Sequence, residues 1–307
     1  MAGPVALTGA TGFIGRNIAE QLIAEGHAVR ALTRRPQVER AGLTWIRGDL
    51  EDPLSLASLV AGTVAVIHCA GAVRGAGAGH FQHVNRDGTR AVTAAALQSA
   101  PTSRFLLISS LAARQPALSW YADSKRAAEL VLEGEARLQW TIFRPPAVYG
   151  PGDREILPLF QAMRRGWLPV VGPPGARFSL LHVSDLAGAV SAWLAADASR
   201  LAWQTFELDD GMPQGYDWNA VRELAQHAWG RTIRSVPVPL AVVRSAAWIN
   251  LALARATGRA PMLTPGKVRE LSHANWVCDN ARIMQNLGWK PEIRLADALA
   301  RPAIVGL

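Results

Sequence analysis

Residues 4–15 of the chain, PVALTGATGFIG, decide its fold. The apolar run 4–8 predicts a short strand, and the spacing of Ile14, Ile18 and Leu22 predicts a helix directly after the glycines. A glycine turn between a strand and a helix lets backbone N–H groups approach a pyrophosphate, and the helix N-terminus adds its positive dipole end. We therefore predict a dinucleotide-binding loop rather than a tight turn without a ligand. Its candidate cofactor contacts are Gly9, Thr11, Gly12, Phe13, Ile14 and Gly15.

Strand and helix patterns alternate through the first half of the chain. The runs 64–68 (VAVIH), 104–109 (RFLLIS) and 140–143 (WTIF) are mainly apolar without a polar alternation, as strands covered by helices on both faces are. The small residues of 91–100 predict a helix that packs closely on that sheet. Short connections imply right-handed β-α-β crossovers, so we predict an α/β fold with a doubly wound parallel sheet of the Rossmann type.

Two arginines follow the second predicted strand, 27–32. NAD enzymes usually carry an acidic residue there for the ribose hydroxyls, whereas this chain has Thr33, Arg34 and Arg35. A guanidinium suits the 2′-phosphate of NADP. The sequence therefore favours NADP(H), with NAD(H) and a pair of merely solvated arginines as the alternatives.

Tyr121 and Lys125 are four residues apart in a stretch that begins with Ser109 and Ser110 at the end of an apolar run. In a helix both side chains lie on one face, and an ammonium favours the phenolate. Lowering a tyrosine pKa from about 10 to near 7 takes about 4 kcal/mol. We expect Lys125 and a cationic nicotinamide ring to supply much of it, so that Tyr121 exchanges a proton with an alcohol or ketone. A solvated lysine beside a half-buried tyrosine is the alternative.

Taken together, these motifs resemble the extended short-chain dehydrogenase/reductase family, which includes NAD-dependent epimerase/dehydratases, 3β-hydroxysteroid dehydrogenases and dihydroflavonol reductases. The resemblance runs over most of the chain. Further matching segments are Gly48-Asp49-Leu50, His68-Cys69-Ala70-Gly71, Val84-Asn85-Arg86-Asp87-Gly88-Thr89, residues 144–152 and His182-Val183-Ser184-Asp185-Leu186-Ala187.

The resemblance implies a role for each matched position. Tyr121 would be the acid/base, Lys125 would lower its pKa and hold the nicotinamide ribose, and Ser110 would bind the substrate oxygen. Ser109 is the neighbouring candidate, since only one of two adjacent strand-end residues points into a site. The remaining implied cofactor positions are Asp49 and Leu50 at the adenine, Cys69, Ala70 and Gly71 at its ribose, Asn85 in the helix that stabilises the sheet, and Pro145, Ala147 and Val148 beside the nicotinamide.

Family members also divide after the sixth strand. By resemblance, 1–150 plus about 178–210 form the nucleotide-binding domain, and 151–177 plus about 211–307 form a smaller C-terminal α/β substrate domain. Residues 206–208 would rejoin the sheet. The resemblance also implies a homodimer, paired through helices near 85–100 and 120–135.

Composition narrows the class of protein. Apolar residues make up 50% of the 307 and charged residues 18%, which excludes a disordered chain. Two isolated cysteines indicate a reducing compartment, and no metal site is expected from their spacing. The first strand starts at residue 4 and no apolar run reaches 18 residues, so we expect a cytoplasmic protein without a signal peptide or membrane span. The net charge of +8 is dispersed, which argues against nucleic-acid binding.

Two segments leave alternatives open. Residues 72–80, AVRGAGAGH, predict a loop near the site, either mobile or a plain connection. Residues 239–257 predict an apolar helix. It could be an ordinary core helix, a lid over an apolar substrate, an oligomer face or a helix in peripheral contact with a membrane.

The substrate signal favours an apolar molecule. Nucleotide-sugar relatives usually place an arginine where this chain has Phe178, and an asparagine where it has Ala147; Arg177 stands one position early. We therefore predict an NADP(H)-dependent oxidoreductase acting on an apolar ketone or alcohol. A nucleotide-sugar epimerase/dehydratase and a non-catalytic nucleotide-sensing or scaffolding member are the alternatives.

Overall fold

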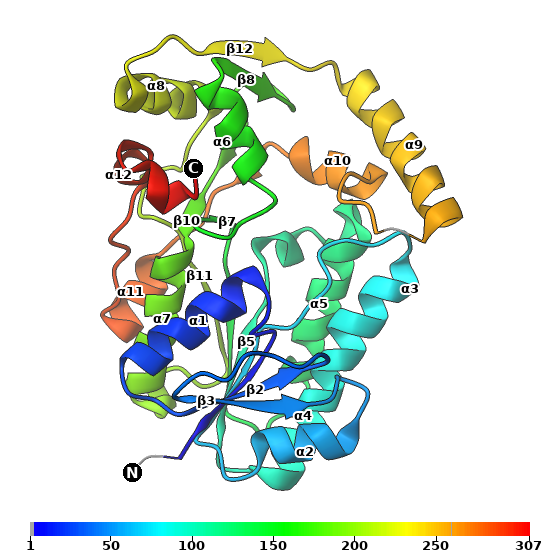
Figure 1. Cartoon of the computed structure of the whole chain (residues 1–307), viewed down its shortest axis with the longest axis vertical. Coiled ribbons are helices and arrows are strands. Elements are labelled where there is room, and N and C mark those ends of the chain that lie inside the picture. Colours follow the sequence, from blue (N-terminus) through cyan, green and yellow to red (C-terminus); the bar gives the residue numbers. More distant parts are fainter. Residues whose placement is uncertain (1–2, 259) are drawn as a thin grey trace.

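The computed structural model describes residues 3–258 and 260–307 (Figure 1). Its centre is a parallel sheet of seven strands in the order β11-β6-β5-β4-β1-β2-β3. The strands are β1 (Val5–Thr8), β2 (Val29–Thr33), β3 (Leu43–Arg47), β4 (Ala65–His68), β5 (Arg104–Ile108), β6 (Trp140–Arg144) and β11 (Gln204–Glu207). The predicted Rossmann-type sheet is confirmed.

The order in which strands are added to the sheet changes side at β1. Val5 pairs with Val29 of β2 on one side and with Ala65 of β4 on the other. The loops that leave β1 and β4 therefore run apart and open a crevice at the carboxyl ends of these strands. This switch point is where doubly wound sheets bind dinucleotides.

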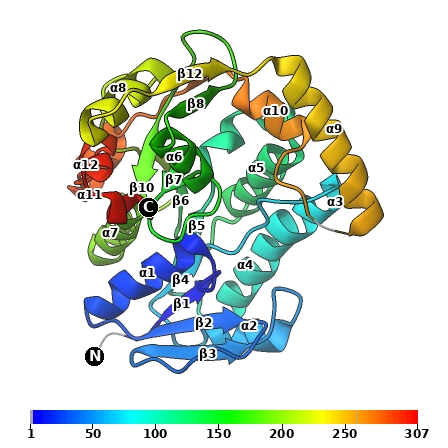
Figure 2. The ribbon, with the colours of Figure 1, turned by 45° about the horizontal axis from the view of Figure 1, so that its top comes forward.

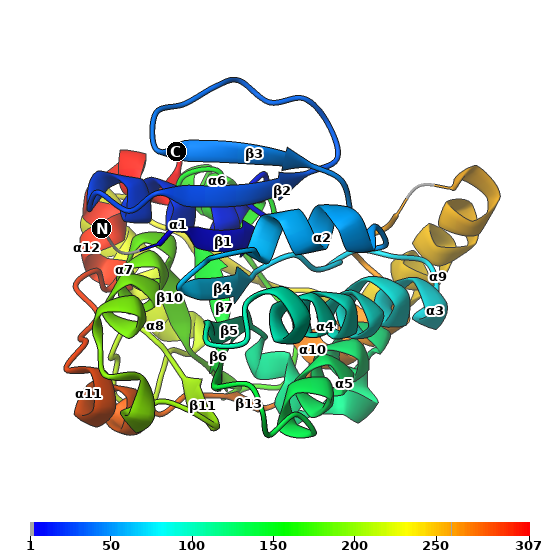
Figure 3. The same ribbon diagram turned by 90° about the horizontal axis from the view of Figure 1, so that it is seen from below.

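Helices cover both faces of the sheet (Figure 3). On one face lie α1 (Phe13–Ala24) and α7 (Val183–Ala195), which bury side chains such as Ile18, Leu22 and Trp193 against the strands. On the other face lie α2 (Pro53–Val60), α4 (Gly88–Ser99) and α5 (Trp120–Glu133), where Leu56, Val92 and Leu132 are buried. Two cores thus hold the strand ends rigidly on either side of the crevice.

Three elements differ from the sequence predictions. Strand β3 was not predicted, because LTWIR is a half-exposed edge strand with mixed polarity rather than a buried apolar run. The predicted loop 72–80 ends early, since α3 (Ala78–Phe81) begins inside it and continues as a π-helical turn, Gln82–Asp87. The return to the sheet predicted at 206–208 occurs two residues earlier, at Gln204.

The smaller half of the molecule carries three two-stranded parallel sheets. They pair β7 (Ala147–Tyr149) with β10 (Leu180–His182), β8 (Trp167–Val170) with β12 (Arg234–Pro237), and β9 (Arg177–Phe178) with β13 (Asn275–Trp276). Strand β10 was expected in the nucleotide-binding domain, yet it lies in a separate sheet with β7. The chain rejoins the main sheet only through β11.

Helices complete this half of the molecule (Figure 2). They are α6 (Leu157–Arg164), α8 (Trp218–Trp229), α9 (Leu240–Thr257), α10 (Pro265–Leu271) and α12 (Leu295–Ala300). Helix α11 (Ala281–Leu287) instead packs on β11 and buries Ile283 in the core of the main sheet. Helix α9 confirms the apolar helix predicted over 239–257, and α8 begins where Asp217 accepts the backbone N–H of Ala220 at 2.8 Å. Among the described residues, no helix combines the length and apolarity that a membrane crossing needs.

Candidate active site

A cavity of about 1170 Å³ lies at the carboxyl ends of the strands and extends into the smaller half of the molecule. One end is lined by the loop after β1, and the middle by Ser110, Tyr121 and Lys125. The other end is lined by β9 and by the segment from Pro261 to Leu271. Residues far apart in the sequence therefore share one elongated chamber.

The glycine loop has the form that a pyrophosphate requires. Gly9 has φ +78°, and a Cβ there would lie 2.7 Å from the backbone nitrogen of Ala70. A Cβ on Gly15 would lie 2.2 Å from the carbonyl oxygen of Gly9, so α1 packs directly on the turn. The N-cap residue of α1 is Gly12, whose lack of a side chain leaves the first N–H groups of the helix open toward the cavity. The loop thus fits the diphosphate of a dinucleotide.

Polar contacts hold the loop after β4 beside the glycine loop. The Thr8 hydroxyl accepts the N–H groups of Cys69 and Ala70 at 3.2 and 3.1 Å, and it lies 2.7 Å from Nδ1 of His68. Burial, aided by the charge of Lys125, lowers the pKa of His68 to about 3, so the imidazole is neutral. Burial raises the pKa of the Cys69 thiol to about 11, which keeps it unreactive.

Asn85 anchors the same loop from the π-helical turn. Its Oδ1 accepts the Ala72 N–H at 2.7 Å, and its Nδ2 donates to the Ala72 carbonyl at 3.1 Å and to Ser124 Oγ at 2.8 Å. The amide is buried and fully engaged by the chain itself. Asn85 therefore positions the cofactor loop against α5.

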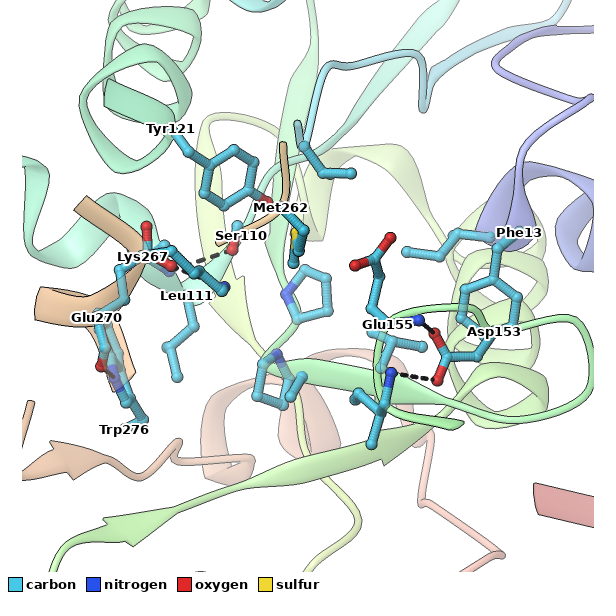
Figure 4. Close-up of a pocket in the computed structure, with 18 of the residues that line it drawn as sticks. Phe13, Ser110, Leu111, Tyr121, Asp153, Glu155, Met262, Lys267, Glu270 and Trp276 are labelled. Atoms are coloured by element: carbon cyan, nitrogen blue, oxygen red, sulfur yellow. Dashed lines mark hydrogen bonds and ion pairs between the residues drawn. The ribbon is translucent and has the colours of Figure 1, made fainter. Parts of the chain in front are cut away.

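Tyr121, Lys125 and Ser110 all line the cavity, and Figure 4 shows Tyr121 and Ser110 beside one another. Tyr121 and Lys125 lie one turn apart on α5, and Ser110 follows the end of β5. Ser110 lies near enough to the Tyr121 phenol to lower its pKa, and Ser110 Oγ accepts the Ala112 N–H at 3.2 Å. Lys125 is buried and donates to the Ile108 carbonyl at 3.0 Å. A Cβ on Gly71 would lie 3.3 Å from Lys125 Nζ, so the ammonium faces the loop after β4.

The protonation of Tyr121 in the chain alone is set mainly by its burial. Burial raises the pKa of Tyr121 to about 12, although the nearby Ser110 lowers it. Burial also lowers the pKa of Lys125. In the chain alone, desolvation of the phenol is therefore the dominant influence on this pKa, while the effect of a cationic nicotinamide stays a prediction. At neutral pH the chain holds Tyr121 as a neutral phenol, which is the form that donates a proton.

A buried ion pair that sequence reasoning missed fixes the adjacent serine. Glu129 is fully buried on α5 and accepts from Ser109 Oγ at 2.6 Å. Arg144 binds both oxygens of the same carboxylate, at 2.8 and 2.6 Å. Ser109 is therefore turned toward α5, which leaves Ser110 as the serine that faces Tyr121. The carboxylate stands four residues after Lys125, a helical spacing that could have marked it.

The end of the cavity beyond Tyr121 is largely apolar. Figure 4 shows Leu111, Met262 and Trp276 on this side. Phe178, at the position of the diphosphate-binding arginine in nucleotide-sugar relatives, lines the cavity and packs on Trp218 at 4.7 Å between ring centroids.

Polar side chains at this end of the cavity form hydrogen bonds and ion pairs with other groups of the protein. Arg177 donates to the carbonyls of Gln214 and Gly215 at 2.7 and 3.1 Å. Glu270 accepts from the Ser119 hydroxyl and pairs with Lys267 at 2.9 Å. These contacts also tie α10 to the start of α5, the helix that carries Tyr121.

The facing wall carries charges that bridge the two halves of the molecule. Asp153 is buried and accepts the backbone N–H groups of residues 155–157 at 2.8 to 3.0 Å. Glu155 pairs with Arg74 of the loop after β4 at 2.6 Å. This pair joins the cofactor side of the cavity to the smaller domain.

Most of the predicted site residues share this cavity. The ones that line it are Gly9, Thr11, Gly12, Phe13, Ile14, Gly15, Cys69, Gly71, Ser109, Ser110, Tyr121, Lys125, Pro145, Ala147 and Val148. The predicted residues outside its lining are Thr33, Arg34, Arg35, Asp49, Leu50, Ala70 and Asn85.

Those outside the lining fall into two groups. Ala70 and Asn85 support the loop after β4, as described above. Arg34 and Arg35 are exposed after β2, where the Thr33 hydroxyl donates to the Arg35 carbonyl at 2.7 Å. Asp49 is exposed after β3, and its carboxylate accepts the Glu51 N–H at 2.8 Å. They stand beyond the strand ends next to the glycine loop, on the side expected for the adenosine.

Comparison with known proteins agrees with this geometry. The model of the NAD dependent epimerase/dehydratase family matches residues 5–206. The chain is 37% identical to a ceramide reductase of Caulobacter vibrioides over 290 residues, which cover 93% of this chain and 89% of that protein. It is 28% identical to a 2-alkyl-3-oxoalkanoate reductase of Stenotrophomonas maltophilia over 238 residues, covering 68% of this chain and 71% of the other.

A solved structure extends the agreement to the whole fold. MoeE5 in complex with UDP-glucuronic acid and NAD superposes with a TM-score of 0.74, at 22% identity and with 97% of each chain covered. With its glycine loop, its Ser-Tyr-Lys site and a family match over most of its length, the chain belongs to the NAD dependent epimerase/dehydratase family and is an NAD(P)-dependent enzyme of the extended short-chain dehydrogenase/reductase class.

Proposed function

We propose that this enzyme reduces the ketone of a hydrophobic, long-chain lipid of the ceramide class to an alcohol with NADPH. The observation that carries the proposal is the apolar end of the cavity, which begins directly at Tyr121 and Ser110. Burial of apolar surface is worth about 25 cal/mol per Å², so acyl or alkyl chains bind there with several kcal/mol. The likeness to a ceramide reductase over 93% of the chain supports the same substrate class.

The chain's own groups account for the proton transfer. A nicotinamide bound there would supply the hydride for the carbonyl carbon. Ser110 donates a hydrogen bond to the carbonyl oxygen, and Tyr121 gives that oxygen its proton as the alcohol forms. Lys125 holds the ribose and stabilises the phenolate that remains. Burial raises the pKa of Tyr121 to about 12 in the chain alone, so the phenol carries the proton that reduction of a ketone requires.

We infer NADP(H) as the preferred cofactor. Arg34 and Arg35 are exposed at the end of β2, where an acidic residue would repel a 2′-phosphate and a guanidinium binds it. NAD(H) stays the alternative, since the matched solved structure holds NAD.

A nucleotide sugar is the less favoured substrate. The diphosphate would meet Phe178 in place of an arginine, and Arg177 is already bound to two carbonyls. Without charge-assisted contacts the diphosphate loses about 1.5–3 kcal/mol for each missing bond.

The decisive experiment supplies purified protein with NADPH and an N-acylated long-chain amino ketone in detergent, and follows absorbance at 340 nm. Net cofactor oxidation with formation of the secondary alcohol is expected. Tyr121→Phe should lower turnover by about a hundredfold or more while cofactor affinity is retained. Binding and epimerisation of UDP-sugars without net oxidation would favour an epimerase, and tight cofactor binding without any turnover would favour a non-catalytic role.

The proposal also includes the cellular compartment and the oligomeric state of the enzyme. Cys69 and Cys278 are both free, which suits the reducing cytoplasm. We infer a homodimer through α4 and α5, where Leu130 is 53% exposed. Sedimentation equilibrium of Leu130→Glu against the unmodified chain tests this pairing, and an unchanged dimer would place the interface elsewhere.

A further inference from the structure

We propose that α9 is an interfacial helix that binds the surface of an anionic lipid bilayer. The surface is the outer stripe, defined as Val242, Trp248, Ile249 and Leu253. Their exposed fractions are 58%, 61%, 60% and 57%. Figures 1 and 2 show α9 along the outer edge of the molecule, with α10 on its inner side.

Helix α9 is apolar on two opposite faces. Val243, Ala247, Leu251 and Ala254 form the buried face, and Val243 and Ala247 pack with Val268 of α10 in one small core. In the outer stripe, Val242, Ile249 and Leu253 are spaced by seven and four residues, so they lie along one line of the helix. A surface helix normally carries polar residues opposite its buried face. The outer stripe instead exposes apolar side chains, which favours a partner that covers them.

The charge around α9 identifies what covers it. Residues 240–269, which comprise α9 and the chain that follows it, contain no Asp or Glu and five Lys or Arg. On the helix itself Arg244 and Arg255 are both exposed, and they lie eleven residues apart on the side where Trp248 stands. Arginine stems can lie on an apolar surface while their heads reach lipid phosphates, and tryptophan favours the same boundary.

A bilayer fits this pattern better than a second copy of the chain. Two copies joined through α9 would bring two stretches without acidic residues face to face, with like charges opposed. An anionic lipid surface attracts each basic residue and accepts the apolar stripe below its headgroups.

The outer stripe is continuous with the cavity through the chain that follows α9. Pro261, Met262 and Thr264 line the cavity directly after the helix, and Lys267 and Leu271 of α10 line it as well. A bilayer against α9 would therefore lie next to the apolar end of the cavity. This delivery of lipid to the site rests on the proposed function, whereas bilayer binding rests on the outer stripe and the charge alone.

Vesicle flotation tests the proposal with the full chain. The unmodified protein should float with vesicles of phosphatidylcholine and phosphatidylglycerol, much less with phosphatidylcholine alone, and less at high salt. Ile249→Gln/Leu253→Gln should weaken binding at least tenfold, because glutamine keeps the helix and removes the apolar stripe. The matched control is Val38→Gln/Leu54→Gln, at positions 89% and 81% exposed on the nucleotide-binding half, which should float unchanged.

Two further measurements separate the possible failures. The Ile249→Gln/Leu253→Gln variant should reduce a short-chain, water-soluble ketone at the unmodified rate but lose activity on substrate embedded in vesicles. Failure of the unmodified protein to float overturns the bilayer proposal whatever its turnover, and a dimer that the same variant converts to monomer assigns the stripe to self-association. Flotation without reduction of any ketone overturns the proposed function and leaves the bilayer surface standing.

Discussion

Replacing Glu129 with glutamine should destabilise the protein by about 3 kcal/mol. The carboxylate is fully buried, and both of its oxygens bind Arg144, whose side chain is only 17% exposed. Removing one partner of a buried ion pair costs about 3–5 kcal/mol, because the other charge is left without compensation. Glutamine keeps the size and one carbonyl oxygen, so the lower end of this range applies.

Urea unfolding followed by tryptophan fluorescence and by circular dichroism measures the loss. The Glu129→Leu/Arg144→Met variant is the matched control, since it removes Glu129 and Arg144 together and retains apolar bulk. Arg126, which also binds Glu129 at 3.1 Å, keeps Glu133 as its second partner. It should lose less stability than Glu129→Gln alone. A loss below about 1 kcal/mol for Glu129→Gln, or a larger loss for the double variant, would refute the reasoning.

Three other predictions concern the cofactor site. Arg34→Ala should weaken NADPH binding and leave NADH binding unchanged in calorimetric titrations, and equal affinities for both cofactors in the unmodified protein would contradict the NADP assignment. Gly15→Ala should abolish dinucleotide binding, because its Cβ would lie 2.2 Å from the Gly9 oxygen, whereas Gly79→Ala, with open space around it, should bind normally. The pKa of His68 is about 3 when folded against about 6.5 when unfolded, so the unfolded state binds more protons between these values. The free energy of unfolding should therefore fall as pH drops below about 6.5, by up to about 1.4 kcal/mol per pH unit. His68→Asn should flatten that slope, and an unchanged slope would show that His68 is not its source.

The cofactor half could be predicted because its signals are local. The glycine loop needs only the order of a strand, three glycines and a helix, and the Tyr121–Lys125 pair needs only a helical spacing. The spacing of the motif favours Ser110 over Ser109 as the serine that faces the substrate. The structure supplies the physical reason, since Ser109 is hydrogen-bonded to Glu129.

The rest depends on contacts between distant segments. Glu270 reaches Ser119 across 151 positions of sequence, and Met262 enters the cavity from a loop with no motif of its own. The raised pKa of Tyr121 in the chain alone shows the same dependence on distant contacts. A sequence shows the neighbouring lysine, but it does not show how deeply the phenol is desolvated.

The place of β11 at the edge of the sheet has a consequence for how the chain folds during synthesis. Strand β6 ends at Arg144, and its partner β11 begins only at Gln204, after the chain has built β7, α6, β8, β9, β10 and α7. Until Phe206 emerges and packs on Phe143, the apolar edge of β6 has no neighbour and is open to pairing with other chains. Nascent chains that stall between these strands are therefore the species most prone to aggregate, and truncation before residue 204 should give inclusion bodies rather than a smaller folded domain.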